Sequence, residues 1–160
     1  MKDRKLELYE IAGYLDNDLH LYNPVTGIVG QYQHPYLVIA NDIVKNNRIT
    51  LIPVLYPIDA LYKTITHNSK EIVPIVEIGR MVDNINADLW KLGEYAGKPC
   101  AKKRTSYLIF DKLGRFQYSG YNVNSIKLFD YLQELKIDYR GLIDAGLAID
   151  ANTLEVNPYK

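Results

Sequence analysis

Basic and tyrosine side chains are interspersed between residues 102 and 121, and their types point more directly to a ligand than any others in the chain. Lys102, Lys103 and Arg104 are consecutive, and two further cations and three tyrosines follow. Such cations neutralise phosphates, and exposed aromatic rings stack on bases. The sequence therefore predicts a candidate nucleic-acid surface. The alternative is that these residues only solvate a strand entry and a hairpin tip. The candidate binding residues are Lys102, Lys103, Arg104, Tyr107, Lys112, Arg115, Tyr118 and Tyr121.

Residue types that ligate metals are scattered along the chain. His20, His34, His67 and Cys100 show no short pair spacing such as H-x3-H or C-x2-C, which structural metal sites use. We therefore predict no metal site and no cofactor. The lysines on either side of Cys100 are expected to lower the pKa of its thiol, but the sequence favours an incidental loop thiol over a catalytic one.

Three carboxylates lie close together near the C-terminal end. A hydrolase needs two acids that face each other, and Asp138, Asp144 and Asp150 fall within one short stretch. Asp144 lies near a predicted helix end, and Asp150 begins a sequence typical of a turn or cap. We therefore predict no catalytic residues and no enzymatic activity, and a carboxylate hydrolase remains the alternative.

The composition is that of a globular protein, with two features that bear on function. The chain has 160 residues, 48% of them hydrophobic and 24% charged, which is enough for one domain with its own core. The formal net charge is +0, whereas proteins that hold phosphates usually carry a basic surplus. Tyrosine occurs 14 times, against three Phe and one Trp. Because a tyrosine ring is amphipathic, this usage suits half-exposed strands and protein interfaces.

The expected location is the cytoplasm. A single cysteine forms no internal disulfide, which fits a reducing compartment. The first residues, MKDRKLELYEIAG, lack the apolar core of a signal peptide. No apolar run approaches the length of a membrane span, so we expect no membrane partner.

The best-patterned elements lie in the last third of the chain. Residues 106–110 and 116–118 predict a β-hairpin, because Asp111 and Gly114 between them suit a tight turn. Apolar residues from Leu128 to Leu135 predict a helix, with Asn124 or Ser125 as its cap. A second short helix is predicted around 142–143. It ends at Gly146, and a short extended segment follows it.

The earlier elements are less clearly patterned. Together with the C-terminal elements they predict an α+β fold, a small antiparallel sheet or hairpins with short packed helices, in a single domain over residues 1–160. Pro53 predicts that its strand is an edge strand or ends early. The predicted elements are a helix over 3–15 capped by Asp3, a hairpin over 20–32, strands over 36–40 and 49–54, helices starting at 57 and 74 and over 88–95, and an irregular segment over 97–103.

The run LFDYLQELKIDYRGLIDAGLAIDANTLEVNPY resembles the C-terminal part of an uncharacterised family of small proteins from Bacteroidetes genomes, their phages and other mobile elements. Members carry a segment similar to GLI-x-x-GLAID-x-NTL. The stretches 6–19 and 52–76 are more loosely similar. The resemblance implies a phage or mobile-element setting, with the cytoplasm of a bacterial host as the location and the virion as an alternative. It implies no activity and no catalytic residue.

The leading functional prediction is a non-enzymatic accessory protein that binds another protein or a second copy of itself. A host or defence factor, or a minor virion role, fits the implied setting. The alternative is a nucleic-acid-binding module that uses the basic and aromatic hairpin at 102–118. The two differ in a testable way, because affinity for nucleic acid falls steeply with salt.

Overall fold

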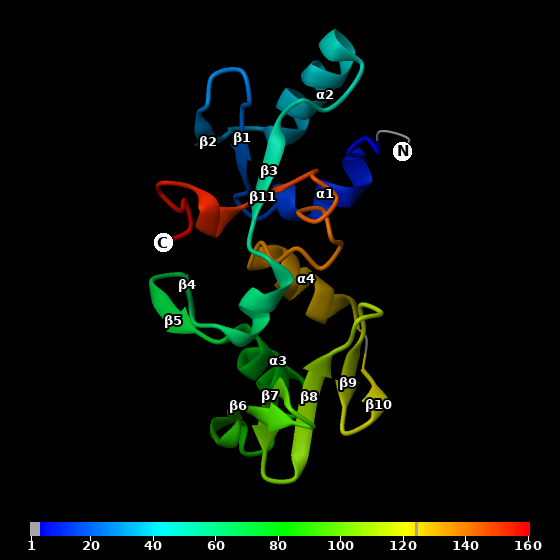
Figure 1. Ribbon diagram of the computed structural model, residues 1–160, viewed down its shortest axis with the longest axis vertical. Coiled ribbons are helices and arrows are strands. Elements are labelled where there is room, and N and C mark those ends of the chain that lie inside the picture. The colour runs from blue at the N-terminus through cyan, green and yellow to red at the C-terminus, as the bar shows by residue number, and fades with distance from the viewer. Residues whose placement is uncertain (1–3, 124) are drawn as a thin grey trace. The chain divides into compact units, whose positions relative to one another are not determined.

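A computed structural model describes residues 4–123 and 125–160, so the predicted caps Asp3 and Asn124 lie outside the described residues. The described part of the chain is mixed α+β, as predicted, with mostly antiparallel sheets (Figure 1). It forms two compact units. Unit 1 takes the chain up to Ile58 together with Leu132–Tyr159, and unit 2 takes Asp59–Tyr131 and Lys160. The single-domain organisation stays a prediction.

Unit 1 is built on a four-stranded sheet in the order β11-β3-β1-β2. The hairpin predicted over 20–32 is confirmed, because β1 and β2 pair antiparallel. Contrary to the prediction, the strand containing Pro53 neither lies at an edge of the sheet nor ends at the proline, because β3 continues to Leu55. It lies between β1 and β11, and β11 pairs only with the two residues after Pro53. The elements of unit 1 are α1 (Leu8–Leu15), β1 (His20–Tyr22), β2 (Val29–Gln31), α2 (Pro35–Asn46), β3 (Ile52–Leu55), β11 (Ile149–Asp150) and the 3-10 helix η3 (Ala151–Thr153).

Helix α2 replaces the strand predicted over 36–40. Pro35 stands at its first position, where the missing N–H costs nothing and the fixed φ favours a helix. The β-branched residues that indicated a strand are accommodated in α2. Among its residues only Ile39 is buried.

The core of unit 1 joins the two ends of the chain. Tyr14 on α1 is fully buried and donates a hydrogen bond of 2.8 Å to the Ile137 carbonyl. Near the C-terminus, the Tyr159 hydroxyl donates to the Val54 carbonyl at 2.6 Å and accepts from the His20 N–H at 3.1 Å. The core residues are Leu6, Ile11, Tyr14, Leu15, Leu19, Leu21, Ile39, Leu51, Leu55, Leu142 and Ala148.

No helix forms around 142–143, where one was predicted. Asp138 is 4% exposed, and its carboxylate accepts the N–H groups of Arg140, Leu142 and Ile143 at 3.2, 2.9 and 2.8 Å. A side chain that satisfies consecutive backbone donors offers the chain an alternative to a helix. Gly146 has a φ of 72°, as expected for the end of this turn.

Unit 2 is dominated by a five-stranded antiparallel meander in the order β10-β9-β8-β7-β6. The hairpin predicted over 106–118 is confirmed as β8 and β9, and the helix predicted over 128–135 is confirmed as α4, which runs from unit 2 into unit 1. The elements of unit 2 are the 3-10 helix η1 (Ile58–Tyr62), β4 (Ile65–His67), β5 (Lys70–Ile72), α3 (Pro74–Val82), the 3-10 helix η2 (Ala87–Leu89), β6 (Lys91–Tyr95), β7 (Lys98–Lys103), β8 (Ser106–Phe110), β9 (Phe116–Tyr118), β10 (Tyr121–Asn122) and α4 (Ile126–Glu134).

Two sequence predictions in unit 2 are wrong. Residues 88–95 form η2 and β6 rather than a helix, and residues 97–103 form β7 rather than an irregular segment. The cause is the turn at Ala96 and Gly97, which have φ values of 50° and 73°. Two consecutive residues with positive φ make a tight hairpin turn whose twist matches that of the flanking strands.

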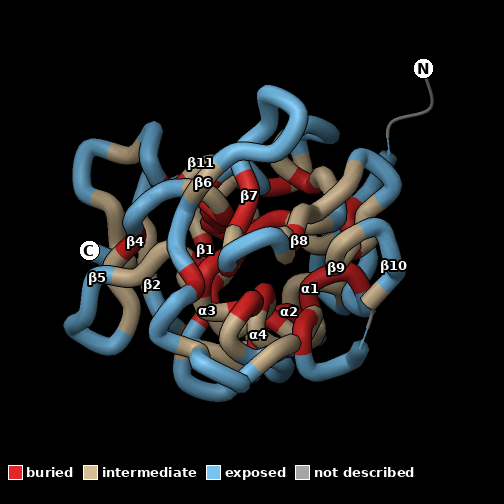
Figure 2. The backbone as a smooth tube through the Cα atoms, turned by 90° about the horizontal axis from the view of Figure 1, so that it is seen from below, coloured by how far each residue is buried: buried red, intermediate tan, exposed pale blue. Residues whose placement is uncertain are grey.

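Helix α3 packs against β6, β7 and β8. Figure 2 shows buried residues along α3 and β7, while β6 and β10 are largely exposed. Gly79 lies where the helix meets Trp90, and a Cβ at this position would lie 2.7 Å from the indole ring. Trp90 is 2% exposed, and its Nε1 donates to the Asp83 carbonyl at 3.0 Å. Gly79 lowers the helix propensity of α3, but it makes room for the single tryptophan.

Candidate nucleic-acid interface

The register of the meander divides the candidate residues between two faces of the sheet. Lys91, Lys102 and Tyr107 are partners across β6, β7 and β8. Ala101, Leu108 and Tyr118 form the neighbouring row. Because side chains alternate along a strand, these two rows point to opposite faces. Ala101 and Leu108 are fully buried, so Tyr118 belongs to the core face, and the row with Lys102 belongs to the open face.

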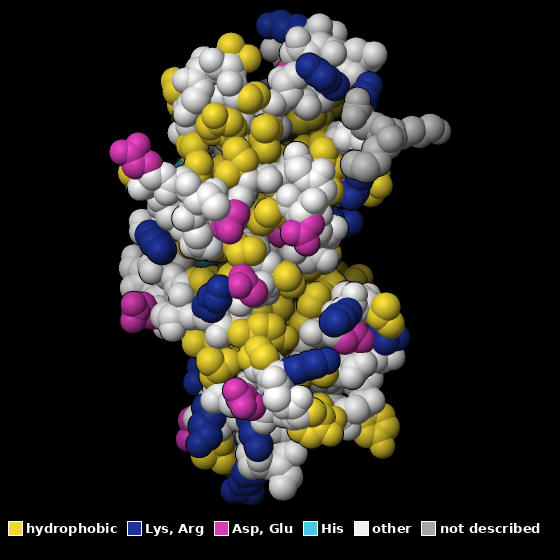
Figure 3. Space-filling view, viewed as in Figure 1, with side chains coloured by type: hydrophobic (Ala, Val, Ile, Leu, Met, Phe, Trp, Pro, Cys, Tyr) yellow, Lys and Arg dark blue, Asp and Glu magenta, His cyan; other side chains and the backbone are white. Residues whose placement is uncertain are grey.

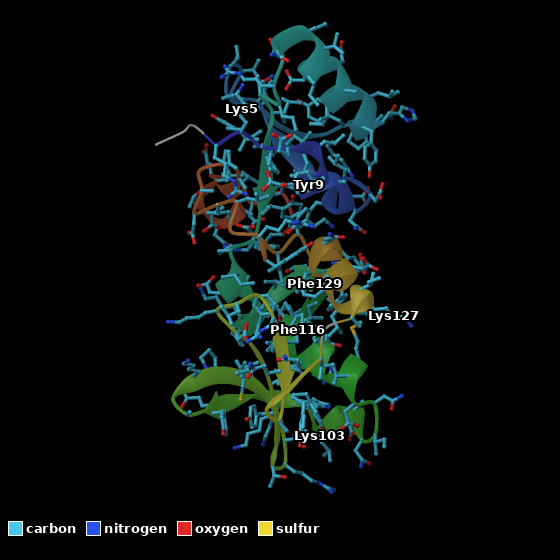
Figure 4. All side chains as sticks on the ribbon, turned by 90° about the vertical axis from the view of Figure 1, so that its right-hand side faces the viewer. Lys5, Tyr9, Lys103, Phe116, Lys127 and Phe129 are labelled. Carbon is cyan, nitrogen blue, oxygen red and sulfur yellow. The ribbon has the colours of Figure 1, made fainter. Side chains whose placement is uncertain are left out.

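Lys103 belongs to the core face and is not available to an external ligand. Its side chain is 10% exposed and forms an ion pair with Asp83. Its Nζ also donates to the Ile85 carbonyl at 2.8 Å and lies 5.3 Å from the Trp90 ring centroid. Figure 4 shows Lys103 and Phe116 on the strands of this sheet. Lys103 therefore connects β7 to the segment between α3 and β6.

Tyr118 shares this polar cluster. Its hydroxyl donates to the Asp83 carboxylate at 3.0 Å. The hydrogen bond and ion pair with Lys103, together with the hydrogen bond from Tyr118, hold the pKa of Asp83 below its ordinary value, although desolvation opposes the charge. The roles of Lys103 and Tyr118 here are structural.

Lys102 and Arg104, in contrast, line an open hollow together with Lys91 and Leu89. The volume of this hollow is about 490 Å³. Lys91 and Arg104 are exposed and Lys102 is half-buried. Arg104 has a φ of 54° in the turn between β7 and β8, where it follows the two strands that carry the lysines. No acidic side chain is among the residues described as lining this hollow.

A stacked pair of tyrosines lies on the same face of the sheet. The rings of Tyr95 on β6 and Tyr107 on β8 are 3.7 Å apart between centroids and inclined by 12°. Tyr95 is 47% exposed. A hydrogen bond with Tyr95 raises the pKa of the Tyr107 hydroxyl above its ordinary value. One ring supports the other, and the exposed ring offers a flat surface for another π system.

The remaining candidates lie away from this hollow. Lys112 is exposed at the tip between β8 and β9. Arg115 is engaged with Asp111, with two nitrogens each 3.0 Å from the carboxylate. Burial opposes the charge on Asp111, but the hydrogen bonds from Arg115 and from the Leu113 N–H outweigh it and hold its pKa below the usual range. Tyr121 is 78% exposed on β10.

Sequence reasoning missed Lys91 and Tyr95, because residues 88–95 were assigned to a helix. The signal for them was the Ala96-Gly97 pair, which predicts a hairpin that brings the cations of β6 beside those of β7.

The net charge of +0 conceals a strong local surplus. Between residues 91 and 122 the chain has seven Lys or Arg and only two Asp or Glu, a local net charge of +5. In Figure 3 the basic side chains gather over the part of unit 2 that holds β6, β7 and β8. The balancing acids lie elsewhere in the sequence.

Cys100 is neither in a loop nor activated by its basic neighbours. It is fully buried in β7. Burial raises the pKa of its thiol and outweighs the opposing effect of Lys102. The expectation of a lowered pKa is therefore wrong, because desolvation dominates.

The three carboxylates near the C-terminal end do not form a common site in the structure. Asp138 is saturated by backbone N–H groups, and Asp150 accepts the Asn152 N–H at 2.8 Å as the cap of η3. Asp144 is exposed. Within residues 4–123 and 125–160, no group of three or more His, Cys, Asp or Glu side chains is placed to hold a metal ion.

The described helices include none with both the length and the apolar character needed to cross a bilayer. The fold and the site thus define a mixed α+β protein with a basic and aromatic face on an antiparallel sheet. No family model, curated protein or solved structure matches the chain. The resemblance of its C-terminal run to the Bacteroidetes and phage family stays a prediction.

Proposed function

We propose that the protein is a non-enzymatic binding module that holds single-stranded nucleic acid on the open face of β6, β7 and β8. The observation that carries this proposal is the convergence of Lys91, Lys102 and Arg104 on one hollow, on the sheet face that also bears the Tyr95–Tyr107 stack. Cations that follow a backbone, together with rings on which bases stack, are the two components of single-strand recognition.

A single strand suits this face better than a duplex. Tyr95 stacks on Tyr107 on one side and is about half exposed. A base must be unpaired and splayed out to extend such a stack. A duplex keeps its bases paired and stacked on one another, so it would contact the cations but would offer no free base to stack on the tyrosine rings.

The test compares a fluorescein-labelled 20-nucleotide single strand with the duplex of the same sequence. We expect the single strand to bind at least about tenfold more tightly, because stacking on an aromatic ring contributes about 1–3 kcal/mol per base. Tyr95→Ala should remove most of this preference.

Lys112→Gln is the control, because Lys112 is an exposed cation at the hairpin tip that does not line the hollow. Lys102→Gln should weaken single-strand binding and Lys112→Gln should not. Equal affinity for single strand and duplex, or equal effects of the two lysine substitutions, would refute the proposal.

Protein binding is the second candidate function, and helix α2 favours it. Leu37 and Val44 on this helix are 69% and 82% exposed, and Tyr36 is 40% exposed. Exposed apolar residues grouped on one element often mark an interaction surface. A second copy of the chain is the simplest partner. If the protein is a phage or mobile-element accessory protein, the partner would be a host or defence factor.

Sedimentation equilibrium tests self-association directly. A mass of twice 18.4 kDa, reduced to the monomer mass by Leu37→Glu, would support it. A monomer mass at high concentration would exclude self-association and leave only a different protein as the partner.

A further inference from the structure

A second hollow, in unit 1, combines apolar walls with a basic rim. Its volume is about 390 Å³, at the lower end of the range of about 300–1,000 Å³ found for small-molecule sites. Leu6 and Leu51 are buried at 9% and 8% exposure, and Ile49 and Ile52 are half-buried. The apolar lining residues are Leu6, Pro24, Ile49, Leu51, Ile52 and Leu147.

Three cations lie among the same lining residues, namely Arg4, Lys5 and Arg48. All three are exposed at the rim, and Figure 4 shows Lys5 just ahead of α1. Arg4 forms an ion pair with Glu10, and Glu10 does not line the hollow. No acidic residue is among those described as lining it.

One carboxylate adjoins the hollow, because Asp42 accepts hydrogen bonds from Thr50 and Leu51, which line it, whereas three cations lie on the rim. The Asp42 oxygens accept hydrogen bonds from the Thr50 Oγ1 at 2.7 and 2.9 Å, from the Leu51 N–H at 3.4 Å and from the Thr50 N–H and the Asn46 amide. Burial opposes its charge, but these hydrogen bonds prevail and hold its pKa below the ordinary value. Asp42 therefore fixes the strand entry at Thr50.

We infer that this hollow binds a small amphiphilic carboxylate, with its hydrocarbon body against Leu6, Leu51 and Ile52 and its charged group between Lys5 and Arg48. An apolar site with a few placed charges is the usual form of a small-molecule pocket. No aromatic ring is among the described lining residues, which favours an aliphatic body over a nucleobase. This site lies in unit 1 and is independent of the sheet face of unit 2.

Decanoate is the probe, and 1-decanol and decyltrimethylammonium are the comparison ligands, each used below its aggregation concentration. Binding is followed by two-dimensional 1H–15N NMR. Decanoate should perturb the amides of residues 49–52 and 146–147. It should bind at least about tenfold more tightly than decanol, because two surface ion pairs together contribute about this factor.

The double variant Lys5→Gln with Arg48→Gln should lower decanoate affinity about tenfold and leave decanol affinity unchanged. Lys45→Gln is the control, because Lys45 is an exposed cation of α2 that does not line the hollow. The inference is overturned if decanoate does not bind, if decanol binds as tightly, if the perturbed amides lie elsewhere, or if the double variant binds decanoate like the wild type.

Discussion

Replacing Gly79 by Ala tests the packing that holds the candidate face in place. Gly79 lies within α3, and a Cβ there would lie 2.7 and 2.8 Å from Cε3 and Cδ2 of Trp90. Real Cβ atoms do not approach other atoms this closely, so the ring or the helix must move. The ring is held by its hydrogen bond to the Asp83 carbonyl and lies beneath Lys103. Trp90 also directly precedes Lys91, the first cation of the site.

Two opposing contributions set the size of the effect. At an unobstructed helix position the substitution would raise the free energy of unfolding by about 1 kcal/mol, because Ala has the higher helix propensity. Overpacking a buried site costs about 1–3 kcal/mol, and the tethered ring favours the upper part of this range. We therefore expect a net loss of about 1–2 kcal/mol. At about 2–4 °C per kcal/mol for a chain of this size, the melting temperature should fall by roughly 2–8 °C.

Thermal unfolding followed by circular dichroism measures this change, and Gly13→Ala is the matched control. Gly13 also lies within a helix, but the atoms nearest to a Cβ there belong to the amide end of Gln133, a flexible side chain that can move at the cost of its hydrogen bond to Tyr139. The control should therefore be nearly neutral. In a Trp90→Leu background, Gly79→Ala should lose most of its cost, giving a coupling energy of about 1 kcal/mol or more. Stabilisation by Gly79→Ala in the wild-type background would refute the packing described for α3.

Three further predictions concern other parts of the molecule. Lys103→Met should lower the free energy of unfolding by about 2 kcal/mol. This is less than the ~3–5 kcal/mol of a fully buried pair, because the partner carboxylate keeps some contact with water. Lys102→Gln should leave urea denaturation unchanged, and equal effects would contradict the assignment of Lys103 to the core face and Lys102 to the open face of the sheet. Asp138→Ala should cost about 3 kcal/mol, because three backbone N–H groups lose their acceptor, and a variant with the wild-type urea midpoint would contradict this role. Burial, and to a lesser extent Lys136, lower the pKa of His20 below 6.5 in the folded state. The unfolded chain therefore binds the proton first, and stability should fall as pH decreases from 6.5 toward 5. Urea denaturation of His20→Phe should show a smaller fall in stability over this pH range, and an unchanged fall would show that His20 is not responsible.

The elements predicted correctly are those whose own sequence contains the residues that form their turns or start their helices. Asp111 and Gly114 defined the β8–β9 hairpin, and the Asp111 carboxylate accepts the Leu113 and Arg115 N–H groups at 2.9 and 3.0 Å. The apolar stripe of α4 and Pro74 at the start of α3 were equally informative. Local signals suffice where the residues that decide the structure are adjacent in sequence.

The elements predicted wrongly depend on partners distant in sequence or on side-chain contacts with the backbone. Strand β6 has no buried residue and is held by its pairing with β7, so its own sequence did not distinguish it from a helix. The turn after Asp138 forms because one carboxylate collects three N–H groups, and apolar periodicity does not report this.

The same limit applies to the candidate site. Lys102 and Lys103 are adjacent and chemically identical in the sequence, yet the alternation of β7 sends one to the open face and the other to the core. Neither assignment follows from residue type. It requires the register of the sheet and the position of Asp83, 20 residues earlier in the chain.

The most direct test of the proposed function is the salt dependence of single-strand binding, measured by fluorescence anisotropy between 50 and 200 mM salt. Three phosphate contacts, from Lys91, Lys102 and Arg104, predict a slope of log K against log salt of about −2, at ~0.7 per contact. Affinity should therefore fall about 20-fold over this range, and Lys102→Gln alone should reduce the fall to about sevenfold. The triple Gln variant should bind weakly and with little salt dependence. No binding at 50 mM salt, or the wild-type slope in the triple variant, would contradict the proposed function.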